Sequence, residues 1–178
     1  MRRILKISVL TLALPMLVIG GYIAYILATG NFHAITPGEA YRSAQLDGKK
    51  LEHYISEYNI RSILNLRGKN DGKQWYKDEV NVSAAHSVMH YDIALSSSKE
   101  PKAEDVRRLI EIFKSAPRPI LIHCQFGADR SGLVAAMWKV IIDKEPRSKA
   151  GKQLSFVYGH FPVKGRQAMD RFFNEWKP

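Results

Sequence analysis

Residues 119–132 have the sequence PILIHCQFGADRSG and contain the only cysteine of the chain, Cys124. Their first residues form a short continuous apolar run, which is typical of a strand buried on both faces in a parallel sheet. Gly127 permits a tight loop after that strand, and the apolar residues from Ser131 onward favour a buried helix. The stretch therefore predicts a strand, a loop and a helix, with Cys124 at the carboxyl end of the strand. Ligand sites of open α/β sheets lie at that edge.

The predicted loop is suited to binding an anion. Successive backbone N–H groups between Gln125 and Arg130 can point at one anion beside the N-terminus of a helix. Arg130 follows Cys124 by six positions, and its planar guanidinium can hold two phosphate oxygens. The same surroundings lower the pKa of the Cys124 thiol and make it a nucleophile. Ser131 can donate a hydrogen bond to the sulfur. The candidate substrate-binding residues of the loop are Gln125, Phe126, Gly127 and Ala128.

The composition excludes several other kinds of site. One cysteine among 178 residues cannot form a disulfide within the chain or a zinc site built on cysteine pairs. The chain is 46% hydrophobic and 25% charged, which indicates a folded protein. His86, His90 and His160 are too scattered along the sequence to predict a metal site. We expect neither a metal nor a cofactor.

Strand and helix patterns alternate along the chain from residue 40 onward. Asp47 is expected to cap a helix that carries Leu51 and Ile55 on one face. Strands are expected at 40–43, 60–66, 88–95 and 119–124. Helices are expected at 73–85, 101–115, 131–143, 146–157 and 165–175. The pattern predicts an α/β fold in which a central, mostly parallel sheet is flanked by helices.

The N-terminal region differs from the rest. Residues 7–28 contain no charged side chain, and as a helix they would extend roughly 33 Å, enough to cross a bilayer. A cleavable signal peptide is the alternative, but its apolar region is shorter, at about 7–15 residues. We therefore predict one N-terminal transmembrane helix. The expected segments are a basic cytoplasmic stub at 1–6, the anchor at 7–28, a linker at 29–38 and a catalytic domain at 39–178.

The charges predict an orientation and a kind of partner. Arg2, Arg3 and Lys6 precede the span, and the next cation is Arg42. The positive-inside rule then places the N-terminus in the cytoplasm and the catalytic domain outside it, in the periplasm of a bacterium. Without the three N-terminal cations, 24 basic residues face 17 acidic ones, a net charge of +7. This balance favours phosphorylated substrates or anionic lipid. The dispersed charges and the lack of a base-reading motif argue against nucleic acid.

The spacing HCx5RSG at residues 123–132 resembles the phosphate-binding loop of the cysteine-dependent protein tyrosine phosphatases. The short chain is most similar to the dual-specificity branch, in particular to its compact bacterial members. The resemblance covers about residues 36–176 and leaves the apolar N-terminal segment outside. Three further stretches are similar to that group, namely Tyr41–Ser43, Ile63–Arg67 and Tyr158–Pro162.

The resemblance implies a phosphatase fold and a two-step hydrolysis of phosphomonoesters without a metal. Cys124 would attack phosphorus and form a cysteinyl-phosphate, which water then hydrolyses. Arg130 and the loop amides would stabilise the phosphoryl group during transfer. His123 is implied to position the loop and tune the thiolate. Ser131 would stabilise the thiolate as it leaves.

The resemblance leaves the general acid open. The family usually supplies it from an aspartate well upstream of the cysteine, and Asp92 lies 32 residues before Cys124. Asp92 alternates within a strand pattern, however, and the following loop at 96–100 has no aspartate. The lipid-directed myotubularins resemble this chain in having an aspartate at the position of Asp129, where it acts as the acid. We rank Asp129 first, Asp92 second and Glu100 third.

The substrate also stays open at this stage. The resemblance implies a phosphorylated protein, whereas the anchor and the basic domain also fit a membrane lipid such as phosphatidylglycerophosphate or a phosphoinositide. A phosphate-binding pseudophosphatase is a third reading. Rhodanese-like sulfur transfer uses a cysteine loop as well, but Arg130 and Ser131 favour phosphate chemistry.

Overall fold

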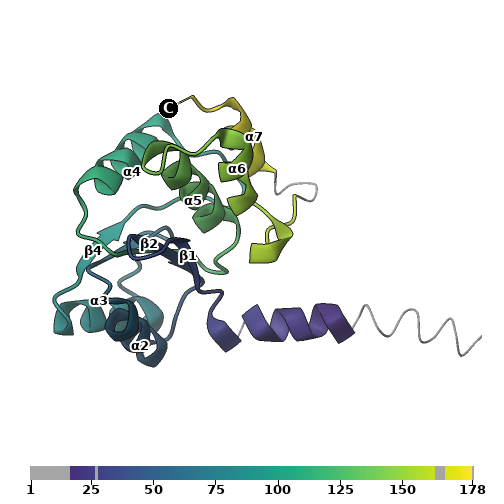
Figure 1. Cartoon of the computed structure of the whole chain (residues 1–178). Coiled ribbons are helices and arrows are strands. Elements are labelled where there is room, and N and C mark those ends of the chain that lie inside the picture. The colour runs from purple at the N-terminus through teal and green to yellow at the C-terminus, as the bar shows by residue number, and fades with distance from the viewer. Residues whose placement is uncertain (1–16, 27, 163–166, 178) are drawn as a thin grey trace, which may run out of the picture.

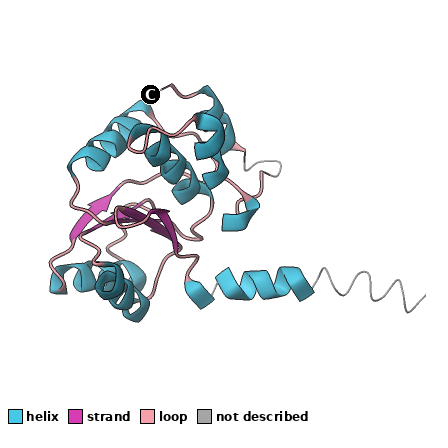
Figure 2. Ribbon diagram, viewed as in Figure 1, coloured by secondary structure: helices cyan, strands magenta, loops and turns pink. Residues whose placement is uncertain are grey.

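The computed structural model describes residues 17–26, 28–162 and 167–177, and it has a five-stranded sheet between two layers of helices (Figures 1 and 2). The strands are β1 (His33–Thr36), β2 (Ala40–Ser43), β3 (Ser62–Asn65), β4 (Met89–Asp92) and β5 (Ile120–His123). The longer helices are α2 (Gly48–Tyr58), α3 (Gln74–Ala85), α4 (Ala103–Ser115), α5 (Asp129–Ile141) and α7 (Ala168–Glu175). The short ones are α6 (Arg147–Ala150), η1 (Gly151–Gln153) and η2 (Phe156–Tyr158).

The strand that precedes Cys124 is the centre of the sheet. The strand order is β1-β2-β5-β3-β4, and β5 is parallel to both of its neighbours. β4 is also parallel to β3, whereas β1 pairs antiparallel with β2 at the edge. The prediction of a mostly parallel sheet with residues 119–124 at a central position is confirmed.

Side chains alternate between two cores because successive residues of a strand face opposite sides of the sheet. Ile120 and Ile122 belong to the core beneath α4, α5 and α7. Leu121 belongs to the core beneath α2, and Ile63 of β3 joins it there. Figure 1 shows α2 and α3 on one face of the sheet and α4 to α7 on the other. The continuous apolar run of β5 is therefore explained by burial on both faces.

Most expected elements are present with small shifts at their ends. Asp47 caps α2 as predicted, its carboxylate accepting a hydrogen bond of 2.9 Å from the backbone N–H of Lys50.

Two expectations need correction. The stretch expected as a linker at 29–38 contains β1, and Asn31 and Ile35 within it are buried.

The second correction concerns residues 146–157, which are α6, η1 and the start of η2 instead of one helix. The break brings the backbone of Gln153 against Gly132 of α5. A β-carbon at Gly132 would lie 2.9 Å from the carbonyl oxygen of Gln153, so this close approach requires glycine there. Packing of backbone on backbone thus overrides the helical pattern.

The described part of the N-terminal apolar run is helical at residues 17–26 and lies beside the folded domain (Figure 1). The hydroxyl group of Tyr22 donates hydrogen bonds to the carbonyl oxygens of Phe156, at 2.9 Å, and of Val157. Residues 7–16 and 27 of the expected anchor lie outside the described residues. Across 17–26, 28–162 and 167–177, no helix combines the length and the apolar character that a membrane span needs.

Candidate active site

The site lies at the carboxyl ends of the parallel strands. In the sheet register Ser43, His123, Asn65 and Asp92 are neighbours, each being the last residue of its strand. Four polar side chains therefore lie in one row across the edge of the sheet. The chain leaves this row at Cys124, turns through residues 125–128 and enters α5 at Asp129. We call residues 124–130 the phosphate loop.

Cys124 is buried at the base of the phosphate loop, with its Sγ 3.4 Å from Oγ of Ser131. Burial by itself raises the pKa of the thiol. The hydrogen bond from Ser131, the charge of Arg130 and the backbone N–H groups of Ser131 and Phe126 together outweigh burial, so the pKa of Cys124 is lowered from its ordinary value. The surroundings predicted to favour a thiolate are present.

This lowered pKa is testable by alkylation. Because the thiolate is the reactive form, the rate of iodoacetamide modification should fall to half only at a pH below the ordinary cysteine value of about 8.5. Ser131→Ala removes a hydrogen bond to the anion and should raise that midpoint. The measurement is the rate of alkylation of Cys124 against pH, followed by mass spectrometry. A midpoint at or above the ordinary value would contradict this account of the loop.

Arg130 is held so that most of its guanidinium remains available. Its Nη1 donates to the carbonyl oxygens of Leu66 and Leu95, each at 3.3 Å. Its Nε is buried and, among the residues that the structure describes, has no hydrogen-bond partner. A buried N–H without a partner costs free energy, and an anion in the loop would satisfy it. Of the other loop residues, Gln125 and Phe126 are exposed whereas Gly127 and Ala128 are buried.

A buried arginine supports the loop from behind. Nη2 of Arg42 donates to the carbonyl oxygens of Gly127, at 2.8 Å, and of Ala128, at 3.1 Å. Its Nη1 donates to the carbonyl oxygen of Gln153 at 2.7 Å and to the Oε1 atom of Gln153 at 2.9 Å. Burial lowers the pKa of Arg42 to about 10, so it remains charged at neutral pH. Because these carbonyl oxygens point toward Arg42, the N–H groups of the loop can point away from Arg42 and toward a bound anion.

Replacing Arg42 by methionine should destabilise the protein strongly. The change leaves buried carbonyl oxygens without donors, and we expect the free energy of unfolding to fall by about 3–5 kcal/mol. Arg61→Met, at an exposed position, is the matched control and should change it by less than about 0.5 kcal/mol. Urea unfolding followed by circular dichroism measures both. Equal stability of the two variants would show that Arg42 does not hold the loop.

Asn31 supports the same loop from the N-terminal side. Its side-chain amide donates to the carbonyl oxygens of Phe126, at 2.9 Å, and of Tyr158, at 3.0 Å. Gly127 has a φ of +70°, and a β-carbon there would lie 2.6 Å from the backbone nitrogen of Ala44. Glycine at this position is therefore required both by the left-handed backbone and by the close packing of the loop on the chain after β2.

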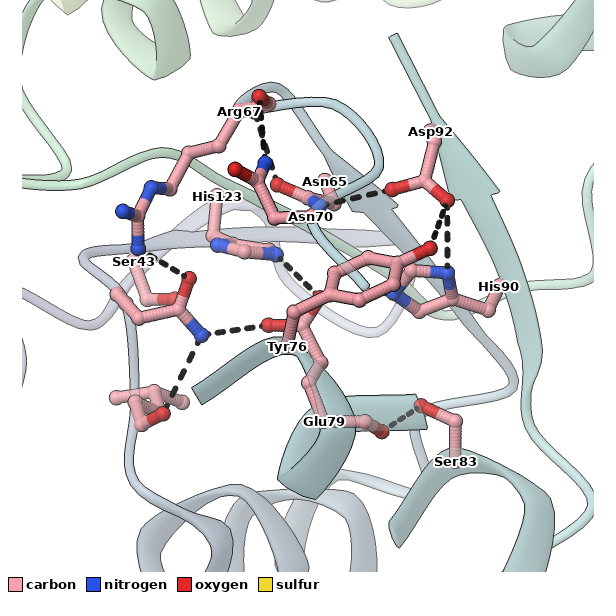
Figure 3. A network of polar contacts seen from close by, with 12 residues as sticks. Ser43, Asn65, Arg67, Asn70, Tyr76, Glu79, Ser83, His90, Asp92 and His123 are labelled. Carbon is pink, nitrogen blue, oxygen red and sulfur yellow. Dashed lines mark hydrogen bonds and ion pairs between the residues drawn. The ribbon is translucent and has the colours of Figure 1, made fainter. Parts of the chain in front are cut away.

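A polar network joins the loop to α3 (Figure 3). Glu79 is buried on α3, and its Oε1 accepts hydrogen bonds from Nε2 of His123, at 3.2 Å, and from Nε2 of His90, at 2.7 Å. Burial raises the pKa of Glu79, but the charge and hydrogen bond of His123 and the bond from His90 hold it well below its usual range. The Glu79 carboxylate thus orients His123, whose role in positioning the loop stays a prediction.

Asp92 belongs to this network and is fully engaged. Its carboxylate accepts hydrogen bonds from the hydroxyl of Tyr76, at 2.6 Å, and from the amide of Asn65, at 2.8 Å, and Nδ1 of His90 lies 3.6 Å away. Burial raises the pKa of Asp92, but hydrogen bonds from His90 and Tyr76 outweigh it and lower the pKa. These contacts favour a permanent carboxylate with a structural role.

Asp129 has a different environment. Its Oδ1 accepts a hydrogen bond of 2.7 Å from Nδ1 of His160, and Nε2 of that ring donates to Asp170 at 3.0 Å. His160 is buried. Burial lowers its pKa, but the two carboxylates outweigh this and raise it. The ring thus lies between two carboxylates, which favour its protonated form, and it holds Asp129 at the start of α5. The Oδ2 atom of Asp129 accepts no hydrogen bond from the residues that the structure describes, so one of its two oxygens is not engaged.

The structure therefore brings together all the predicted loop residues and adds residues that sequence reasoning missed. Glu100 is instead paired at the surface with Arg171, at 3.0 Å. The missed residues are Asn31, Arg42, Glu79, His160 and Asp170. Arg42 could have been found from the sequence, because a lone cation inside a short strand pattern requires buried partners. Glu79 and Asp170 could not have been found in this way, since each lies on a polar helix pattern that also fits an exposed face.

A buried thiol with a lowered pKa, a following arginine and an anion-binding loop between a central strand and a helix define a class of enzyme. The chain is a cysteine-dependent phosphatase of the dual-specificity type. The model of a family described as DSP-PTPase phosphatase fused to NAD+ kinase matches residues 38–169. The chain belongs to this family.

A curated relative shares part of this region. The probable NAD kinase 2, chloroplastic, of Oryza sativa subsp. japonica is 26% identical over 114 residues, which are 60% of this chain and 11% of that protein. The chain thus spans only a small part of the length of this relative.

Solved structures share the fold. Pseudomonas aeruginosa TpbA is 16% identical with a TM-score of 0.61, and the match covers 83% of this chain and 85% of that one. The core catalytic domain of the PP-IP phosphatase SIW14 from S. cerevisiae, in complex with citrate, is 20% identical with a TM-score of 0.64 and coverages of 83% and 85%. TpbA has also been solved in complex with pTyr, at 16% identity, a TM-score of 0.60 and coverages of 82% and 84%.

Proposed function

We propose that this chain hydrolyses phosphomonoesters in two steps through a cysteinyl-phosphate on Cys124. The observation that carries the proposal is the geometry of the phosphate loop. The buried Sγ of Cys124 is bound by Ser131, and Arg130 has a buried Nε with no partner among the described residues. This arrangement offers one nucleophile and a set of unused donors to the same anion.

In the first step the Cys124 thiolate attacks phosphorus, an S–P bond forms and the P–O bond to the leaving group breaks. Arg130 and the N–H groups of the loop bind the three non-bridging oxygens, whose charge is spread during transfer. The leaving oxygen takes a proton from the general acid. The products are the released alcohol or phenol and the phosphorylated enzyme.

In the second step water attacks the phosphorus and the S–P bond breaks. Inorganic phosphate leaves, and the sulfur returns to a thiolate. The hydroxyl of Ser131, 3.4 Å from Sγ, stabilises that anion and makes the sulfur a better leaving group. The proton of the attacking water passes to the group that acted as acid in the first step.

Asp129 is our choice for that acid and base. Asp92 already accepts hydrogen bonds from Tyr76 and Asn65, and its lowered pKa disfavours the protonated form that a general acid needs. Asp129 lies next to Arg130 in the sequence, and His160 fixes only one of its oxygens. Its second oxygen accepts no hydrogen bond from the residues that the structure describes, so it can exchange a proton with the leaving oxygen and with water.

The two aspartates can be separated by leaving-group dependence. Asp129→Asn should lower the turnover of an alkyl phosphate, which needs a proton on its leaving oxygen, by about 10²-fold or more. It should affect p-nitrophenyl phosphate, a good leaving group, much less in the first step. Asp92→Asn should reduce both substrates to a similar extent. Single-turnover rates with the two substrates measure this, and a selective loss in Asp92→Asn would transfer the acid role to Asp92.

The substrate class is a phosphorylated protein or an anionic phospholipid. Support for the former comes from TpbA, which was solved with pTyr. The net charge of +7 outside the N-terminal cations attracts either substrate, because both carry phosphate dianions. A panel of phosphopeptides and phospholipid monoesters, assayed for phosphate release, distinguishes them.

We also propose that residues 7–28 anchor the chain in a membrane, with the N-terminus in the cytoplasm and the catalytic domain on the other side. The uncharged run and the preceding cations support this. Leu17 of the described helical part is exposed and lines no cavity, as expected of a side chain that faces lipid. Protease protection of the domain in sealed vesicles, with and without detergent, tests the topology. Digestion from the cytoplasmic side would overturn it.

A further inference from the structure

A large cavity lies next to the phosphate loop and is not used by the mechanism above. Its volume is about 920 Å³, near the upper end of the range for ligand pockets in proteins. It is bounded by the helical residues 17–26, by the chain after β2 and by residues 156–161. It meets the phosphate loop at Gln125, Phe126 and Ala128, while Cys124 and Arg130 do not line it. One ligand could therefore place a phosphate in the loop and extend into the cavity.

The lining is apolar over most of its area. Ile19, Ile23 and Ile26 line it from the helix, and Phe156 and Val157 line it from η2. Charged side chains contribute only at Asp47 and Lys50. The backbone of a bound peptide would need hydrogen-bond partners, which such a lining does not supply. A hydrocarbon chain needs none, and its burial is favourable in proportion to the area removed from water.

Three exposed aromatic side chains belong to the lining of the cavity. Phe126, Phe156 and Phe161 all line the cavity and are 63%, 68% and 55% exposed. A soluble monomeric protein rarely exposes so many large apolar side chains together, and such a patch marks a site of contact with an apolar partner. The patch adjoins an anion-binding loop, so the partner must combine an apolar part with a phosphate.

The helix that closes the cavity, at residues 17–26, is the C-terminal part of the proposed membrane anchor at 7–28. Tyr22 binds the carbonyl oxygens of Phe156 and Val157 and thereby fixes this helix against η2. In the sequence, residues 7–16 continue the run without a charged side chain. If the run is an anchor, the cavity lies close to the membrane surface. A lipid could then reach the loop without leaving the bilayer entirely.

We infer that this cavity binds an acyl chain of a phospholipid whose terminal phosphomonoester lies in the phosphate loop. The substrate class is the phosphatidic-acid type, a glycerolipid that carries an unesterified phosphate. The inference rests on the proposed function, because hydrolysis of the lipid uses the same Cys124 chemistry. It adds to that function a second binding element, the acyl chain, which a phosphopeptide does not have.

The test uses the full chain reconstituted in phosphatidylcholine vesicles that contain phosphatidic acid, with water-soluble p-nitrophenyl phosphate as the second substrate. Ile23→Asn and Phe156→Asn place a neutral polar group in the cavity. Each should lower kcat/KM for phosphatidic acid by about 10-fold or more, since an apolar contact with the chain is lost. Both should leave p-nitrophenyl phosphate hydrolysis within about twofold, because neither residue contacts the loop chemistry.

Leu17→Asn is the matched control. Leu17 lies on the same helix and is 72% exposed, but it does not line the cavity. This variant should hydrolyse both substrates at the parent rate, which separates a cavity effect from altered insertion of the helix. Equal loss in Leu17→Asn and Ile23→Asn would overturn the inference.

The other outcomes are also decisive. The inference is wrong if the cavity variants hydrolyse phosphatidic acid like the parent, or if they lose both substrates in parallel. It is also wrong if the parent accepts p-nitrophenyl phosphate and phosphopeptides but not phosphatidic acid, and in that case the phosphatase function still stands. Failure of the parent on every substrate would instead overturn the proposed function itself.

Discussion

Replacing Cys124 by serine should lower the turnover of p-nitrophenyl phosphate by about 10⁴-fold or more, as expected for loss of a covalent nucleophile. The lowered pKa of Cys124 favours the thiolate, whereas a serine hydroxyl at the same place stays protonated. Among the described residues, the one side-chain hydrogen bond at this position is that between Cys124 and Ser131, and His123 is bound to Glu79 through Nε2. Serine would therefore remain a weak nucleophile.

The same variant should still bind phosphate. Arg130, the loop amides and the supporting Arg42 are unchanged by the substitution, so the affinity for inorganic phosphate should stay within about threefold of the parent. Isothermal titration measures it, and circular dichroism confirms the fold. Full activity of Cys124→Ser would show that the reaction does not use this residue. Loss of phosphate binding together with the fold would show a structural defect instead.

Replacing Arg130 by lysine should lower kcat by about 10²–10³-fold although the charge is kept. A lysine ammonium is a point charge and cannot hold two phosphate oxygens in one plane. The carbonyl oxygens of Leu66 and Leu95, which now accept from Nη1 of Arg130, would also lose the group that they orient. We expect the effect to be larger on kcat than on KM, because the contact strengthens as charge spreads in the transition state.

Arg61→Lys provides the comparison, since Arg61 is exposed on the sheet's other end and should show parent kinetics. Steady-state rates for p-nitrophenyl phosphate measure both variants. A tenfold or smaller loss of kcat in Arg130→Lys would mean that the loop amides bind the phosphoryl group largely by themselves. The assigned role of Arg130 would then be wrong.

The architecture could be predicted because the sequence pattern of each element agrees with the packing of that element in the fold. The apolar run at 119–123 needs burial on both faces, and only a central strand provides that. Asp47 caps its helix through a hydrogen bond to a residue three positions away, so the cap needs no contact with distant segments of the chain. The loop chemistry of Cys124, Ser131 and Arg130 is likewise contained within eight consecutive positions after the strand.

The parts that escaped prediction depend on contacts between distant segments. Arg42 and Gln153 are 111 residues apart and Glu79 and His123 are 44 apart, so no local pattern links them. The broken helix at 146–157 follows from the close approach of backbone at Gly132. The ranking of Asp129 before Asp92 was made from the sequence and stays a prediction, which the hydrogen bonds that Asp92 accepts from Tyr76 and Asn65 support.

The most direct test of the account is to trap the covalent intermediate. The protein is mixed with an excess of p-nitrophenyl phosphate, quenched in acid within the first turnover, digested and analysed by mass spectrometry. We expect one phosphoryl group on the peptide that contains Cys124, and none in Cys124→Ser. A phosphoryl group on another residue, or steady turnover with no phosphorylated enzyme at any quench time, would contradict the account.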